Sequence, residues 1–80
     1  MTAHVYVTLK RTVLDAQGQT VHSALRGLGH AGIADVRQGK FFEIEVKGLS
    51  REAAQAEIDQ IAREVLSNPV IEDYRVVISD

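Results

Sequence analysis

The sequence predicts a single α+β domain spanning residues 1–80, a two-layer sandwich with two helices on one face of a mainly antiparallel sheet. Eighty residues are enough for one domain and one core. Stretches of period-two hydropathy alternate along the chain with stretches of helical period, in the order β-α-β(-β)-α-β. In that order, two helices packed on one sheet face form the most economical two-layer arrangement.

The first third of the chain predicts a strand and then a helix. Residues His4 to Lys10 alternate with period two, which is the pattern of a strand. Asp15 is placed to cap the following helix, and Gly29 and Gly32 are placed to end it. The apolar stripe of this helix consists of Val21, Ala24, Leu25 and Leu28.

The remainder predicts a second strand region, a helix and a last strand. Period-two alternation runs from Ile33 to Lys47, and Gln38-Gly39 within it is compatible with a hairpin or with a bulge in one long bent strand. Gly48 and Ser50 open the second helix, whose apolar stripe is Ala54, Ile58, Ile61, Ala62 and Val65.

The second helix has a strong predicted stop. We expect Asn68 to take the left-handed conformation there, and Pro69 lacks the N–H that a continuing helix requires. From Tyr74 onward the period is two again, which predicts a final strand.

The uncovered face of the sheet carries apolar residues where polar ones are expected. Tyr6, Phe41 and Val77 each lie opposite the predicted core side of their own strand. Isolated apolar surface residues are common, but a chain this small has little core of its own. We therefore predict an oligomer, a dimer or a dimer of dimers, that associates through these three residues.

Composition excludes several classes of partner. The net charge is −2, and the nine basic residues are scattered, so no positive patch predicts nucleic-acid binding. No apolar run approaches the roughly 20 residues that span a bilayer, and no signal peptide pattern is present, so we expect no membrane contact and a cytoplasmic location.

No arrangement of residues predicts a catalytic, cofactor or metal site. The chain has no cysteine, and His4, His22 and His30 lack metal-ligand spacing. Glu72 and Asp73 are neighbours on a strand and therefore face opposite sides. The segment Val36 to Lys40 presents two cations around a glycine, a weak anion-binding pattern for which a solvated hairpin tip is the better interpretation.

Three segments in this order resemble the PurS family, the small subunit of phosphoribosylformylglycinamidine (FGAM) synthase. They are Asp15-Ala16-Gln17-Gly18, Val36-Arg37-Gln38-Gly39-Lys40 and Leu66-Ser67-Asn68-Pro69-Val70-Ile71-Glu72-Asp73-Tyr74. Each is weak alone, whereas their order and spacing across the whole chain are specific. Ala16 departs from the family, which typically has proline there; this loosens the helix start without removing the Asp15 cap.

The resemblance implies a non-catalytic role in purine synthesis. The family's complex converts formylglycinamide ribonucleotide (FGAR), glutamine and ATP to FGAM, glutamate, ADP and phosphate, with ATP and Mg²⁺ used by the synthetase subunit. It implies that this chain binds no cofactor and, as a dimer, bridges the glutaminase and synthetase subunits and assists ammonia transfer. The residues we expect to face those subunits are Arg37, Lys40, Asn68, Pro69, Glu72, Asp73 and Tyr74.

Two other functions fit the same element order. A ferredoxin-like domain that senses a small molecule would bind a ligand of its own and be stabilised by it. A stand-alone enzyme would require a catalytic constellation, which the sequence does not contain.

Overall fold

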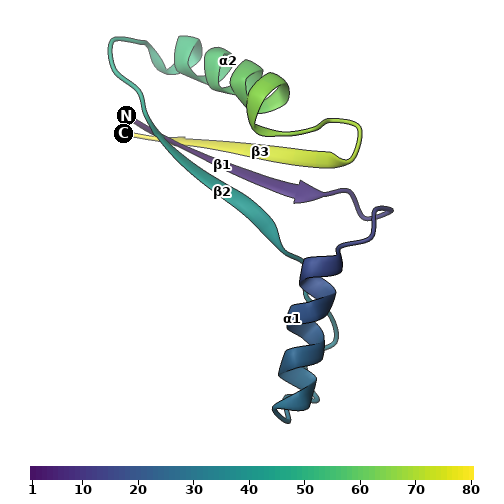
Figure 1. The fold of residues 1–80 in the computed structure, drawn as a ribbon. Helices are drawn as coiled ribbons and strands as arrows, with labels where there is room; N and C mark the ends of the chain where they lie inside the picture. The colour runs from purple at the N-terminus through teal and green to yellow at the C-terminus, as the bar shows by residue number, and fades with distance from the viewer.

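The computed structural model describes residues 1–80 and contains three strands, two α-helices and one π-helical turn (Figure 1). In chain order the elements are β1 (Thr2–Leu9), α1 (Ala16–Gly27), β2 (Gly39–Glu45), α2 (Arg51–Ile61), the turn η1 (Ala62–Leu66) and β3 (Glu72–Ser79). No helix is both long and apolar enough to cross a bilayer.

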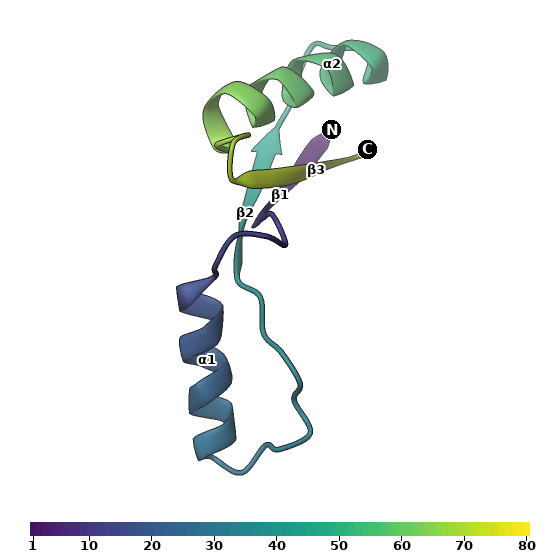
Figure 2. The ribbon, with the colours of Figure 1, turned by 90° about the vertical axis from the view of Figure 1, so that its right-hand side faces the viewer.

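The strands form one antiparallel sheet in the order β2-β1-β3. In the register, Val5 of β1 lies opposite Phe42 of β2 and Val76 of β3, so these three side chains share a face. The predicted α+β class and antiparallel sheet are confirmed. The optional fourth strand does not form, because residues 28–38 run back beside α1, where no strand is available for pairing (Figure 2).

The core lies between β1 and α2. Ala3, Val5 and Val7 are fully buried and pack with Ile58 and Ala62. The Ser50 hydroxyl begins α2 as predicted, accepting a bond from the N–H of Ala53. Complete burial of one valine side chain contributes on the order of 2 kcal/mol, so each of these buried contacts stabilises the sheet layer against α2.

The π-helical turn η1 changes which residues of the second helix reach the core. Its wider turn inserts one extra residue, and Ser67 N–H donates to the carbonyl of Ala62, five residues earlier (3.0 Å). As a result Leu66 packs against the core, whereas Val65 is 74% exposed. The predicted stripe is therefore correct as far as Ala62 and wrong at Val65.

The predicted left-handed conformation of Asn68 is also wrong. No residue other than glycine has a positive φ, and the chain leaves the helix through Ser67, which is extended. Asn68 instead organises the turn before β3. Its side-chain oxygen accepts from Val70 N–H (3.1 Å), and its carbonyl accepts from Ile71 N–H and Glu72 N–H.

Only α2 covers the sheet, which differs from the expected pair of helices on one face. Helix α1 extends away from the end of the sheet, and residues 28–38 return along it (Figures 1 and 2). We call residues 16–38 the arm. The radius of gyration is 15.9 Å, whereas a compact domain of this length has one of about 12 Å. The predicted apolar stripe of α1 is consequently not buried within its own chain.

Candidate functional site

The base of the arm is fixed by one buried carboxylate. Asp15, 3% exposed, accepts from Gly18 N–H (2.9 Å) in the first turn of α1 and from Gln38 N–H (2.7 Å) at the entrance to β2. The first bond is the predicted helix cap, and the second ties the returning chain to the same side chain. We call these two bonds the Asp15 clamp.

Gly18 is required for the Asp15 clamp to close. A Cβ at this position would collide with the Asp15 carboxylate and with the carbonyl oxygen of Val36. Because the collision involves backbone as well as a side chain that is itself hydrogen bonded, a larger residue has no simple way to fit. The glycine therefore allows α1, the preceding loop and the returning segment to meet at one point.

Arg37 strengthens the same junction. Its Nη2 atom donates to the carbonyl oxygens of Lys10 (3.1 Å), Val13 (3.4 Å) and Leu9 (3.5 Å). These carbonyls belong to the end of β1 and to the loop that follows, so the guanidinium holds that loop against the arm. Farther out, the His22 ring donates to the Ile33 carbonyl (2.8 Å) and holds the returning segment against α1.

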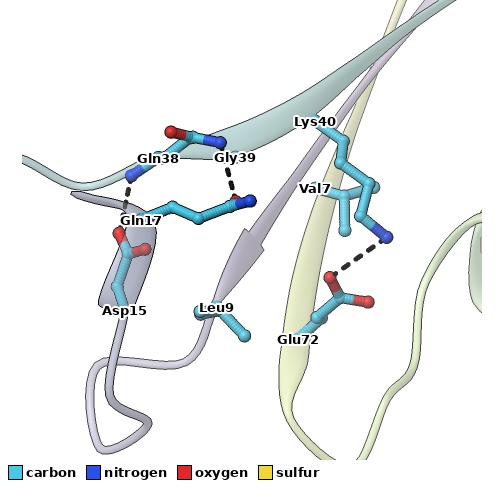
Figure 3. A pocket seen from close by; sticks show the side chains of 8 residues that line it. All are labelled: Val7, Leu9, Asp15, Gln17, Gln38, Gly39, Lys40 and Glu72. Atoms are coloured by element: carbon cyan, nitrogen blue, oxygen red, sulfur yellow. Dashed lines mark hydrogen bonds and ion pairs between the residues drawn. The ribbon is translucent and has the colours of Figure 1, made fainter. Parts of the chain in front are cut away.

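A pocket of roughly 210 Å³ lies at this junction (Figure 3). Its walls come from all three segments that the sequence analysis singled out. Gln17 and Gln38 bond to each other across it (2.7 Å), and Lys40 and Glu72 form an ion pair on the other side (3.4 Å). The complete lining is Val7, Leu9, Asp15, Gln17, Gln38, Gly39, Lys40 and Glu72.

The environment of Asp15 favours its charged form. Donation from Gln38 N–H, then from Gly18 N–H, lowers the pKa of Asp15 below its ordinary value of 3.8, and the charge of Arg37 adds to the effect. Burial acts in the opposite direction but does not prevail. Asp15 is therefore an ionised structural group at neutral pH, with each carboxylate oxygen accepting one backbone N–H.

The residues predicted to face other subunits divide into an exposed and an internal group. Asn68, Pro69 and Lys40 are exposed, and Asp73 is exposed beside Lys10 (3.2 Å). Glu72 lies largely buried on the other side of β3, where it accepts from Asn68 N–H (2.7 Å). The opposite orientations of Glu72 and Asp73 are as predicted.

Arg37 and Tyr74 belong to the internal group. Arg37 is half-buried against the carbonyls of the β1 end. Tyr74 faces α2, and its hydroxyl donates to Asp59 (3.0 Å). Burial, then this bond, raises the pKa of Tyr74. The side chains of these two residues therefore hold elements of the chain together.

The structure brings Tyr6, Phe41 and Val77 to one sheet face, opposite α2. We call it the open face. The rings of Tyr6 and Phe41 lie 5.1 Å apart, and the Arg75 guanidinium lies 4.4 Å from the centre of the Tyr6 ring. Phe41 is 55% exposed and Val77 39% exposed. These neighbours form a continuous amphipathic surface.

Comparison with known proteins identifies the family. Residues 2–80 match the family model described as PurS, phosphoribosylformylglycinamidine (FGAM) synthase. The chain belongs to the PurS family. A PurS subunit from Mycobacterium leprae is 46% identical over 74 residues, covering 92% of this chain and 90% of that protein. The PurS subunit of Bacillus subtilis is 37% identical over 76 residues, covering 95% and 89%.

Solved PurS structures share the fold. Bacillus subtilis PurS superimposes with a TM-score of 0.87 at 35% identity, covering 99% of this chain and 98% of that chain. A chain in the structure of PurLQS from Thermotoga maritima gives a TM-score of 0.87 at 29% identity, covering 95% and 93%. The PurS fold thus includes the extended arm, because these alignments span it.

Sequence reasoning missed the second function of Asp15. The helix cap was predicted from local spacing, whereas the bond to Gln38 joins residues 23 positions apart. The spacing of residues within one short segment does not predict a contact with a residue so far along the chain. The one available indication was that Asp15 and Gln38 both lie in the segments that resemble the PurS family.

We predict that Asp15→Asn destabilises the protein at neutral pH and that the difference disappears in acid. An amide has one acceptor oxygen, so one of the two N–H groups loses its partner. Because the folded-state pKa of Asp15 lies below its ordinary value of 3.8, its contribution is present above that ordinary value and is lost as the pH falls through the lower folded-state pKa. Urea-unfolding midpoints of both proteins, measured between pH 7 and pH 3, should show the difference in midpoint shrinking at the acid end. The same difference at both ends would contradict the prediction.

Proposed function

We propose that this chain is the small, non-catalytic subunit of an FGAM synthase, and that it bridges the glutaminase and synthetase subunits and assists transfer of ammonia between them. The observation that carries the proposal is the match to the PurS family over residues 2–80. The Thermotoga maritima relative occurs in a PurLQS structure, which supports an assembly with two further kinds of subunit.

The chemistry of the reaction explains why a bridging subunit is useful. Glutamine hydrolysis releases ammonia, which is a nucleophile only while unprotonated. The two active sites must therefore be held in fixed relative positions so that ammonia reaches the activated amide before it is protonated or lost. ATP and Mg²⁺ belong to the synthetase step in this proposal and are not held by this chain.

The docking surface for the larger subunits is the turn before β3 together with its neighbours. The exposed side chains of Asn68 and Pro69 lie there, and Val70, which follows them in the chain, is 80% exposed. Lys40 and Asp73 lie near this turn on opposite faces of the sheet, because Lys40 is opposite Val7 on the core side and Asp73 is opposite Thr8 on the open face. An apolar side chain rimmed by polar groups is typical of protein contact surfaces. Arg37, Glu72 and Tyr74 contribute indirectly, because their hydrogen bonds within the chain hold the elements that carry this surface.

The experiment that tests the proposed function measures FGAM formation by the glutaminase and synthetase subunits with and without this chain. Glutamine and an ammonium salt serve as alternative nitrogen sources. We expect glutamine-driven turnover to require the chain and ammonium-driven turnover to proceed without it. If neither depends on the chain, the coupling role is wrong, and a domain that senses a small molecule becomes the better explanation.

For the open face we propose self-association through Tyr6, Phe41 and Val77. The variant Phe41→Asp places a charge beside Tyr6 on this surface, where burial against another protein would be unfavourable. Since Phe41 is already 55% exposed, the single chain should fold normally. We expect light scattering to show half the mass of the unmodified protein; an unaltered mass would argue against this contact.

A further inference from the structure

Glu72 carries a largely buried charge that its own chain satisfies only in part. Its side chain is 10% exposed, and burying a carboxylate is unfavourable unless its oxygens are hydrogen bonded or closely paired. One oxygen, Oε1, accepts from Asn68 N–H (2.7 Å). The other, Oε2, lies 3.4 Å from Lys40 Nζ, which is longer than the roughly 2.7–2.9 Å of a charge-assisted hydrogen bond. Within the chain, Oε2 therefore has only a loose ion pair.

Glu72 and Lys40 form one side of the pocket at the base of the arm (Figure 3). The Lys40 side chain is 57% exposed, so its ammonium group can turn toward a ligand without breaking a buried contact. From the arm, the Gln17 side chain reaches into the same space. Its Oε1 accepts from Gln38, which leaves its Nε2 free to donate. The pocket thus combines one acceptor, Glu72 Oε2, with two donors, Lys40 Nζ and Gln17 Nε2.

The floor of the pocket is apolar and its volume is small. Val7, which is fully buried, and Leu9, which is half-buried, form this floor at the end of β1. The volume of roughly 210 Å³ corresponds to about seven water molecules at about 30 Å³ each. Pockets for drug-sized ligands and cofactors measure roughly 300–1,000 Å³. The size therefore favours a small metabolite over a nucleotide.

The charges of the pocket distinguish among small ligands. A phosphate ion would meet a single cation and would be repelled by Glu72. A divalent metal ion would find one free carboxylate oxygen, because both oxygens of Asp15 already accept backbone N–H groups. A zwitterion matches both signs, since its ammonium group can donate to Glu72 and its carboxylate can accept from Lys40 and Gln17. An α-amino acid carries both charges on one carbon and adds a side chain for the apolar floor.

We propose that the pocket at the base of the arm binds a small α-amino acid with an aliphatic side chain. The α-ammonium group donates to Glu72 Oε2 in place of the loose pair with Lys40. The α-carboxylate accepts from Lys40 Nζ and Gln17 Nε2, and the side chain lies on the apolar floor of the pocket. This site is a property of the chain itself and does not rest on the proposed function, so either can fail without the other.

Titration calorimetry of the full chain with L-alanine, L-valine and L-leucine tests the proposal. We expect one molecule of L-valine per chain, with a dissociation constant of roughly 1 mM or tighter, which is attainable for so small a ligand. Two analogues of L-valine each remove one charge, since isobutylamine lacks the carboxylate and 3-methylbutanoate lacks the ammonium group. Each should bind about tenfold more weakly or worse. Failure of all three amino acids to bind, or equal affinity for either analogue, would overturn the proposal.

Matched variants locate the site. Glu72→Gln removes the charge while its amide oxygen can still accept from Asn68 N–H, and Lys40→Met keeps an unbranched side chain without the charge. Each should weaken L-valine binding about tenfold or more. The controls Glu57→Gln and Lys47→Met change exposed residues outside the pocket and should leave the affinity unchanged. If Glu72→Gln binds L-valine as tightly as Glu57→Gln does, the ligand lies elsewhere and the proposal is wrong.

Amide hydrogen exchange provides a second measurement that does not depend on any variant. Asn68 N–H donates to Oε1 of the same carboxylate whose Oε2 would bind the ligand. A bound ammonium group holds the Glu72 side chain in place, so saturating L-valine should slow exchange at Asn68 several-fold. Exchange at Ala53, whose N–H donates to the Ser50 hydroxyl at the start of α2, serves as the control and should not change. Unchanged exchange at Asn68 under saturation would contradict binding at Glu72.

Discussion

The Asp15 clamp determines the arrangement of the whole chain. One buried carboxylate accepts a bond from the first turn of α1 and another from the residue before β2, so it fixes where the arm leaves the sheet and where it returns. Two elements depend on it directly: the orientation of α1 and the start of β2. Gly18 provides the space for the clamp, and Arg37 holds the neighbouring loop.

This constraint explains how so small a chain serves as a subunit. Its own core is limited to one helix on a three-stranded sheet, and further apolar surface lies on the arm and on the open face. A protein whose function is to hold larger partners in position needs such surfaces. The same three segments that carry the resemblance to the PurS family meet at the base of the arm, which connects the family's sequence features to the geometry of this junction.

The sequence predicted the elements whose pattern is local. The period of the hydropathy pattern predicted β1, β3 and the first two turns of α2. Capping chemistry predicted the roles of Asp15 and Ser50 at the helix starts. Four features did not follow from these patterns. Asn68 did not take the left-handed conformation, and the π-helical turn moved the core contact from Val65 to Leu66. The region before Gly39 formed no strand, and α1 left the sheet. The path of the arm depends on contacts between residues far apart in the chain, such as Asp15 with Gln38, which hydropathy period does not predict. The apolar stripe on α1 was expected to face the core of its own chain, whereas Val21 and Leu28 are exposed because the arm leaves the sheet.

Amide hydrogen exchange at Gln38 measures whether the Asp15 clamp holds the arm. Gln38 is an exposed residue outside any strand, and its N–H has no partner other than the Asp15 carboxylate. If the Asp15 clamp organises the chain, this amide should exchange as slowly as those in the centre of β1 and become fast in Asp15→Asn. If the Gln38 amide exchanges as fast as those of residues 30–35 at the tip of the arm, the Asp15 clamp does not hold the arm and does not organise the chain.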